Sequence, residues 1–156
     1  HFMWGKVTLF EECARVPMIV HVPGRTKPKT SSAGLVELVD LYPTLAELCG
    51  LDLPEKLQGR SLTGMLDDPA AAGKESAYTV VSRGELLGRV IRSDHWRYAE
   101  WGSREQNELY DLNADPAEHV NLVNIPEHRR VVRRMQRMLS EKQAQAAAAR
   151  EPIRPK

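Results

Sequence analysis

The sequence has no long hydrophobic run. Its apolar stretches are much shorter than the roughly 20 residues that a helix needs to cross a bilayer, so we expect no membrane span. The 22 Lys and Arg residues nearly balance the 21 Asp and Glu residues, and the formal net charge of +1 argues against broad electrostatic capture of nucleic acid. With 42% hydrophobic residues, the 156-residue chain can still bury one core or two small ones.

Cysteine is also scarce, because Cys13 and Cys49 are the two cysteines of the sequence. They could pair with each other, so they do not define the redox compartment. Cys49 ends an apolar helical pattern, and we expect it to be a small buried hydrophobic residue. No internal repeat is visible.

The first half of the chain has the pattern of one α/β unit. Met18–Val22 is a short, mostly apolar run before a Pro-Gly pair, as in a strand that is buried on both faces of a parallel sheet. Asp40 is a good helix N-cap, and Gly50 a good left-handed stop. The helix between them would place three leucines on one apolar face: Leu41, Leu45 and Leu48.

The second half has the pattern of a small antiparallel sheet. Ala77–Ser82 and Leu86–Ile91 are rich in β-forming residues and are separated by a turn that contains glycine, which predicts a hairpin. Trp96–Trp101 and Glu108–Asp111 would add two more strands, for a sheet of about four.

A C-terminal helix is predicted to follow the sheet. Asn124 and Glu127 have the spacing of a capping box at its start. Five apolar residues at helical spacing form a stripe that should cover one sheet face: Val131, Val132, Met135, Met138 and Leu139. The tail, residues 143–156, is rich in alanine and then interrupted by proline, so we expect it to fray.

Several short blocks carry more specific information. A Trp-x-Lys turn (Trp4–Lys6) precedes Arg-Val-Pro (Arg15–Pro17), and Val-Asp-x-x-Pro-Thr-Leu (Val39–Leu45) precedes Leu-x-Gly-x-Ser-Leu (Leu57–Leu62). The longest block, Arg97–Leu122, contains Arg-Tyr-x-Glu-Trp, Leu-Tyr-Asp-Leu and Asp-Pro-x-Glu-x-x-Asn-Leu. In this order and spacing the blocks resemble the type I sulfatases of the alkaline phosphatase superfamily, with the iduronate-2-sulfatase-like branch as the best match.

The resemblance implies a fold of the α/β class that begins in the middle of a larger enzyme. Residues 1–66 would be the C-terminal end of a sulfatase catalytic domain, with the last strand and helix of an alkaline-phosphatase-like α/β sheet. Residues 67–142 would form a small α+β subdomain, in which the antiparallel sheet packs on the C-terminal helix.

The resemblance also implies a chemistry, in which a formylglycine hydrate attacks a sulfate monoester bound to a divalent cation, usually Ca²⁺. The Cys/Ser-x-Pro-x-Arg motif that supplies the nucleophile is absent from this chain, and so are the metal ligands. Lys6 matches the lysine that contacts the sulfate, so it is the candidate catalytic and substrate-binding residue. His1 matches a histidine near the metal loop and is a second candidate for substrate binding.

Two alternatives remain open at this point. One is a phosphonate or phosphodiester hydrolase of the same superfamily, because a lysine and a divalent metal also suit a phosphoryl group. The other is a non-catalytic module that binds anions through the arginines of the C-terminal helix. A sulfated sugar is one candidate substrate, the family favours a periplasmic or secreted location, and unpaired apolar edges are expected to make the chain self-associate.

Overall fold

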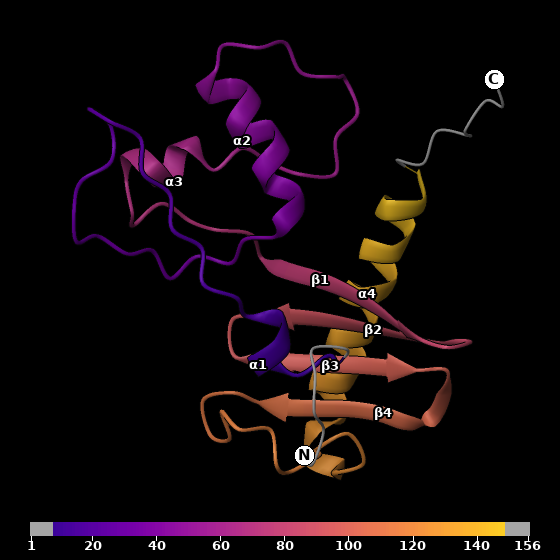
Figure 1. Ribbon diagram of the computed structural model, residues 1–156. Helices are drawn as coiled ribbons and strands as arrows, with labels where there is room; N and C mark the ends of the chain where they lie inside the picture. The colour runs from indigo at the N-terminus through magenta and orange to yellow at the C-terminus, as the bar shows by residue number, and fades with distance from the viewer. Residues whose placement is uncertain (1–7, 149–156) are drawn as a thin grey trace, which may run out of the picture. The chain divides into compact units, whose positions relative to one another are not determined.

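The computed structural model describes residues 8–148, which belong to two compact units (Figure 1). Unit 1 combines the chain up to Pro17 with Glu75–Glu141, and unit 2 combines Met18–Lys74 with the chain from Lys142. Within the described residues, no helix is long and apolar enough to cross a membrane.

Unit 1 contains the predicted antiparallel sheet of four strands, in the order β1-β2-β3-β4. The strands are β1 (Ser76–Arg83), β2 (Leu86–Ser93), β3 (Trp96–Trp101) and β4 (Ser103–Asp111). The hairpin between β1 and β2 is confirmed, and its turn contains Gly84 with a φ of 59°. β4 begins at Ser103, earlier than the expected Glu108, because it pairs with β3 directly after the turn at Gly102.

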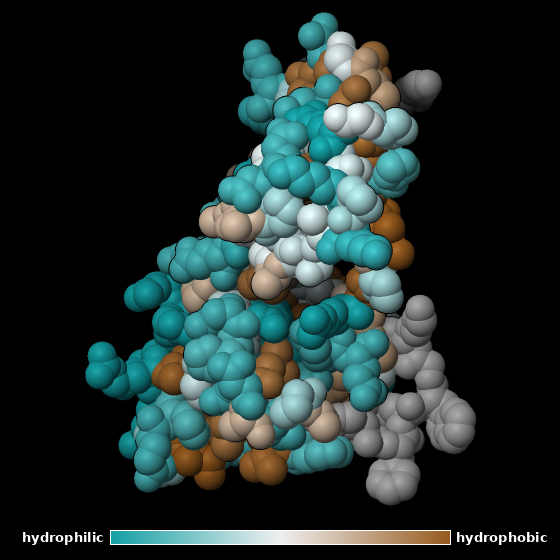
Figure 2. All heavy atoms as spheres, turned by 90° about the vertical axis from the view of Figure 1, so that its left-hand side faces the viewer, coloured by the Kyte–Doolittle hydropathy of each residue, from teal (hydrophilic) through white to brown (hydrophobic). Residues whose placement is uncertain are grey.

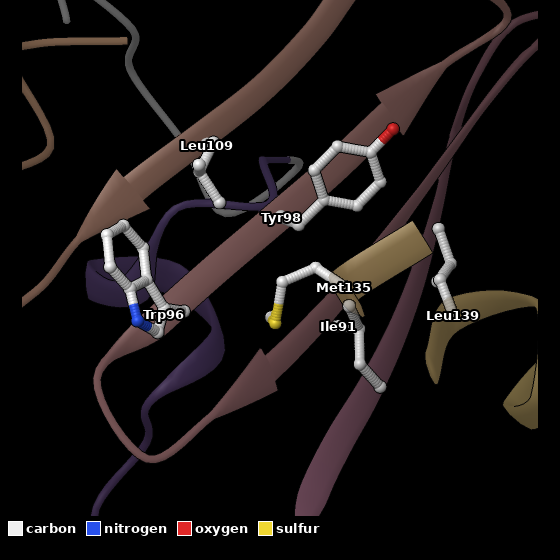
Figure 3. Close-up of a cluster of buried hydrophobic side chains, with 6 residues drawn as sticks. All are labelled: Ile91, Trp96, Tyr98, Leu109, Met135 and Leu139. Carbon is white, nitrogen blue, oxygen red and sulfur yellow. The ribbon is translucent and has the colours of Figure 1, made fainter. Parts of the chain in front are cut away.

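Helix α4 (Arg129–Ala148) covers one face of this sheet, as the apolar stripe predicted. Because side chains alternate between the two faces of a strand, every second residue points to the helix. The resulting core contains six buried side chains (Figure 3): Ile91, Trp96, Tyr98, Leu109, Met135 and Leu139. Pairing of Tyr98 with both Ile91 and Leu109 across the strands brings these side chains together.

The hydroxyl group of Tyr98 is a polar group at this core, and it is fully satisfied. It accepts hydrogen bonds from the side-chain amides of Asn107 and Gln136, each at 2.9 Å, and it donates to Glu100 at 3.0 Å. Burial raises the pKa of Tyr98 well above its ordinary value. The hydroxyl group therefore stays protonated, and it fixes α4 over β3 by a polar contact as well as by packing.

The opposite face of the sheet carries the start of the described chain. Leu9 is buried there against Val90 and Ala99, the neighbours of the core residues in β2 and β3. The one-turn helix α1 (Glu11–Ala14) comes next and lies in front of the sheet in Figure 1. Unit 1 is therefore a sheet between α4 on one face and residues 8–14 on the other.

The start of α4 differs from the predicted capping box at Asn124. A short 3₁₀ helix, η2 (Pro126–His128), comes first, its N-cap residue is Ile125, and no side chain caps it. Pro126 explains the difference, because proline has no N–H group and suits the first position of a helix. At its other end α4 continues to Ala148, through the part of the tail that the sequence predicts to fray from residue 143.

Unit 2 contains the 3₁₀ helix η1 (Leu38–Asp40) and the helices α2 (Leu41–Leu48) and α3 (Thr63–Asp67). Two side chains of the Val39–Leu45 block bind the backbone of the Leu57–Leu62 block. The buried carboxylate of Asp40 accepts from the backbone N–H of Arg60 at 2.7 Å, and the Thr44 hydroxyl group accepts from that of Leu62 at 2.9 Å. The two blocks are thus one hydrogen-bonded structure.

Asp40 is the N-cap residue of α2, as the sequence predicts, but its side chain makes no capping hydrogen bond to that helix. Asp40 Oδ2 accepts from the backbone N–H of Glu37, in a capping box around η1. Asp40 Oδ1, which binds the Arg60 N–H, also lies 2.5 Å from Lys74 Nζ. Lys74 Nζ is equally close to Glu37. Arg60 and Lys74 lie far from Asp40 along the chain, so the local sequence could not indicate that the Arg60 backbone and the Lys74 ammonium group bind this carboxylate.

The expected strand at Met18–Val22 is wrong, because these residues adopt no regular structure and Ile19 is 93% exposed. Two prolines, Pro17 and Pro23, flank the run and have no N–H groups to donate to a sheet. A buried parallel strand also needs neighbours on both edges, and within residues 8–148 no other strand pairs with it.

The predicted apolar face of α2 is not buried either. The buried residues of the helix are Pro43, Thr44 and Ala46, whereas Leu45 is 59% exposed. Cys49 is also exposed, contrary to expectation. Hydrophobic side chains accordingly reach the surface among hydrophilic ones (Figure 2). In unit 2 they include Leu38, Tyr42, Leu45, Leu51 and Leu53.

Gly59 is required by the contact between the two blocks of unit 2. A Cβ atom at this position would overlap the backbone carbonyl group of Val39. We expect Gly59→Ala to lower the free energy of unfolding of unit 2 by about 1–3 kcal/mol, the usual cost of overpacking. Gly64→Ala is the matched control, since a Cβ there meets nothing within 4 Å and Gly64 lies within α3. Urea denaturation of both variants makes the comparison, and equal stabilities would contradict this role of Gly59.

Candidate functional site

The two candidate site residues, Lys6 and His1, lie outside the described residues. The described chain begins two residues after Lys6, at Thr8, and both Thr8 and Leu9 are buried. We call residues 8–14 the anchored segment, because side chains of the sheet and of one loop bind its backbone.

Arg97 in β3 is the centre of these contacts. Its side chain is only 1% exposed, on the sheet face opposite α4. The guanidinium group donates to the backbone carbonyl of Leu9 at 2.7 Å. It also forms ion pairs with Glu118, through Nε, and with Glu108 in β4, at 3.3 Å.

Two aromatic rings complete the surroundings of this guanidinium group. The Arg97 Cζ atom lies 5.0 Å from the ring centroids of both Phe10 and Tyr110. These rings pack edge to face, 6.2 Å apart, and burial raises the pKa of Tyr110 to about 12. A cation over aromatic faces gains electrostatic attraction that grows as water is excluded.

Glu118 connects Arg97 to the anchored segment a second time. While one carboxylate oxygen pairs with Arg97, the other accepts from the backbone N–H of Glu11 at 2.7 Å. The backbone of Glu118 has a φ of 56°, in the left-handed region where a residue with a Cβ atom is strained. Glycine would adopt this conformation more easily, but it has no carboxylate for Arg97.

Neighbouring residues of the same block hold Glu118 in place. Asp115 accepts from the backbone N–H of Val120 at 2.8 Å and so closes the turn around Glu118. The Asn121 side chain then accepts from the backbone N–H of Leu109 at 3.0 Å and donates to the Asn107 carbonyl at 3.1 Å. The Asp-Pro-x-Glu-x-x-Asn motif therefore fastens a loop to β4 and presents its glutamate to Arg97.

Burial sets the protonation behaviour of the two glutamates. It raises the pKa of Glu108 and of Glu118 above the ordinary value, and the charge of Arg97 opposes the rise in both cases. Because the folded pKa is the higher one, ionisation of these carboxyl groups costs folding free energy as the pH rises through that range. The neighbouring Arg97 limits this cost.

The arrangement can position a chain segment, but it does not form a metal site. Among residues 8–148, no group of three or more His, Cys, Asp or Glu side chains could hold a metal ion. The Ca²⁺ ion that the resemblance implies thus has no fitting ligands in the described part of the chain.

Comparison with known proteins identifies the family. The family model "N-sulphoglucosamine sulphohydrolase, C-terminal" matches residues 1–145. The chain belongs to this sulfatase family. It corresponds to the C-terminal region of a sulfatase, as the motifs predicted, whereas the iduronate-2-sulfatase-like branch is not confirmed.

Curated relatives of this sulfatase region are more than three times as long as the chain. Mouse arylsulfatase K is 29% identical over 135 residues, which cover 78% of this chain and 24% of the relative. N-acetylglucosamine-6-O-sulfatase of Bacteroides thetaiotaomicron is 27% identical over 154 residues, which cover 93% of this chain and 28% of the relative. The chain therefore spans about a quarter of the length of the curated relatives that it matches.

Solved structures support the same fold. One is a protein in complex with its substrate D-glucosamine-2-N,6-O-disulfate. The match covers 87% of this chain and 29% of that protein's chain, with a TM-score of 0.80 and 26% sequence identity. A phosphonate monoester hydrolase from Silicibacter pomeroyi matches 91% of this chain and 31% of its own, also with a TM-score of 0.80, at 22% identity. The second likeness shows a shared fold alone.

The sequence motifs include Arg97 and Glu118, but the motifs alone do not indicate that these side chains bind the anchored segment. A signal for Arg97 exists, since it is a charged residue between the core residues Trp96 and Tyr98 of one strand. Such an arginine must be paired if its face is covered. The sequence does not show that the cover is the segment after Lys6.

Removal of one partner from the buried pair should be costly. Glu118→Gln would leave the Arg97 charge buried without its main counter-ion, and we expect it to lower the free energy of unfolding by about 3 kcal/mol. Glu141→Gln is the matched control, because Glu141 pairs with Arg137 at 3.8 Å on the surface, where the loss should be below about 0.5 kcal/mol. Chemical denaturation followed by Trp fluorescence gives both values, and similar losses in the two variants would refute the role of Glu118.

Proposed function

We propose that this chain is the C-terminal part of an enzyme that hydrolyses sulfate monoesters. The observation that carries the proposal is the match of a sulfatase family model to residues 1–145, which includes Lys6 and the anchored segment. The nucleophile, a formylglycine in the family, and the divalent cation would come from a part of the protein outside this sequence.

Lys6 is the proposed catalytic residue of the chain. Hydrolysis of a sulfate ester builds negative charge on the sulfuryl oxygens and on the departing oxygen, and a fixed ammonium group stabilises that charge. Such a group is effective only if it is held in place before the reaction. Burial of Thr8 and Leu9 and the bond from Arg97 to the Leu9 carbonyl support this, because they fix the described chain from its start, two residues after Lys6.

Sulfated sugars are the proposed substrates. One curated relative is an N-acetylglucosamine-6-O-sulfatase, and one similar structure contains a glucosamine disulfate as substrate. His1 is proposed as an additional substrate-binding residue, on the resemblance alone. Arg97 is not assigned to the substrate, since it is buried and each of its three side-chain nitrogens already donates within the protein, to Leu9, Glu108 and Glu118.

Lys6→Ala in the full-length protein should lower kcat/KM for a glucosamine 6-sulfate ester by about 10²–10³-fold, the usual loss when one group that stabilises transition-state charge is removed. Lys56→Ala is the control, because Lys56 is exposed and far from Lys6 in sequence. Steady-state release of sulfate measures both. Unchanged turnover in the Lys6 variant would exclude its catalytic role.

Assays of the same full-length protein distinguish a sulfatase from a phosphonate or phosphodiester hydrolase. We expect kcat/KM for the sulfate ester to exceed that for a phosphonate monoester or a phosphodiester of the same alcohol. A preference for either phosphorus ester would replace the proposed function with the superfamily alternative.

The isolated chain should be inactive and should self-associate. It has no nucleophile motif, and the exposed apolar side chains of unit 2 favour association between copies. Sulfate release and light scattering test the two statements. Turnover that requires added Ca²⁺ would contradict the expected inactivity. A monodisperse monomer at high concentration would contradict the expected self-association.

A further inference from the structure

A face of α4 carries five exposed arginines: Arg129, Arg130, Arg133, Arg134 and Arg137. At 3.6 residues per turn they occupy one side of the helix, over about 12 Å of its length. The opposite side is the apolar stripe that packs on the sheet. We call this set the arginine face.

The arginine face is electrostatically unfavourable for the helix itself. Its members lie three or four residues apart, where like charges repel each other. Arg129 and Arg130 also begin α4, whose first turn contains no acidic residue, and cations there oppose the helix dipole. Helix stability therefore does not explain this arrangement.

Neighbouring acidic groups neutralise little of this charge. Arg134 lies 3.9 Å from Asp94 and Arg137 lies 3.8 Å from Glu141, and all four side chains are well exposed. Exposed pairs at such distances contribute little. Arg25 shows the contrast, since it binds both oxygens of Asp67, at 2.6 and 2.7 Å.

We propose that the arginine face is a binding surface for a sulfated polysaccharide, separate from the catalytic residues. The inference rests on the proposed function, because it takes the sulfated sugar from there. Guanidinium groups bind two oxygens of a sulfate group at once, and they lose their hydration more easily than ammonium groups do. A convex row of cations holds a single anion weakly, but it gains affinity from a chain with repeated charges.

The consequence is a preference for long substrates. A polysaccharide held on α4 stays close to the protein between successive cleavages, which raises the effective concentration of its sulfate esters. A short sulfated sugar cannot bind at the arginine face and the catalytic site together, so it gains nothing.

The test compares two triple variants of the full-length protein with equal loss of charge. One is Arg130→Gln, Arg133→Gln and Arg134→Gln on the arginine face. The control replaces exposed cations elsewhere: Lys27→Gln, Lys56→Gln and Arg104→Gln. Circular dichroism checks that both variants fold, and removal of repulsion predicts no loss of thermal stability in the first.

Heparin is the probe, and its dissociation constant is measured at several salt concentrations. We expect the arginine-face variant to bind heparin at least about tenfold more weakly than the wild type, with a smaller salt dependence, and the control to change little. Equal binding by wild type and the arginine-face variant would overturn the proposal. The proposal would also be overturned if the wild type bound single-stranded DNA of matched charge as tightly as heparin, because the arginine face would then be a general polyanion surface.

Activity on a monosaccharide sulfate separates this inference from the proposed function. We expect kcat/KM for a glucosamine 6-sulfate ester to be the same in the wild type and in the arginine-face variant. Absence of sulfatase activity in the wild type would refute the proposed function, while the heparin comparison would still decide whether the arginine face binds the polysaccharide.

Discussion

The structure of unit 1 depends on one buried cation. A guanidinium group that is almost fully excluded from water is tolerated only if its charge and donors are paired. Arg97 meets this condition with a backbone carbonyl from the start of the described chain, a glutamate from a loop and a glutamate from the adjacent strand. Three other segments of the chain thereby converge on β3, and the anchored segment after Lys6 is one of them.

A buried carboxylate has a similar role in unit 2. Asp40 is fully buried, and it joins η1, the backbone at Arg60 and the ammonium group of Lys74. The motifs that carry the family resemblance are thus largely structural in the described part of the chain. They provide charged or polar side chains that bind backbone groups across long sequence separations, while Lys6 is proposed to supply the chemistry.

Local patterns in the sequence predicted the features of the fold that depend on local interactions. The four strands, the glycine turn and the apolar stripe of α4 follow from side-chain periodicity and backbone preference. The strand expected at Met18–Val22, the capping bond expected from the Asp40 side chain and the cap expected at Asn124 are not observed, for other reasons. These reasons are flanking prolines, partners far along the chain, and a proline that sets the helix start. For the candidate site, the sequence indicated Lys6, and only the structure revealed how the segment after it is held.

Amide hydrogen exchange at Glu11 tests the central claim most directly, because this N–H group donates to Glu118 in the anchored segment. In the wild type we predict slow exchange at Glu11. In Glu118→Ala we predict fast exchange there, while the amide of Ile91 in β2 stays protected. Fast exchange at Glu11 in the wild type, or equal protection in both proteins, would contradict the account.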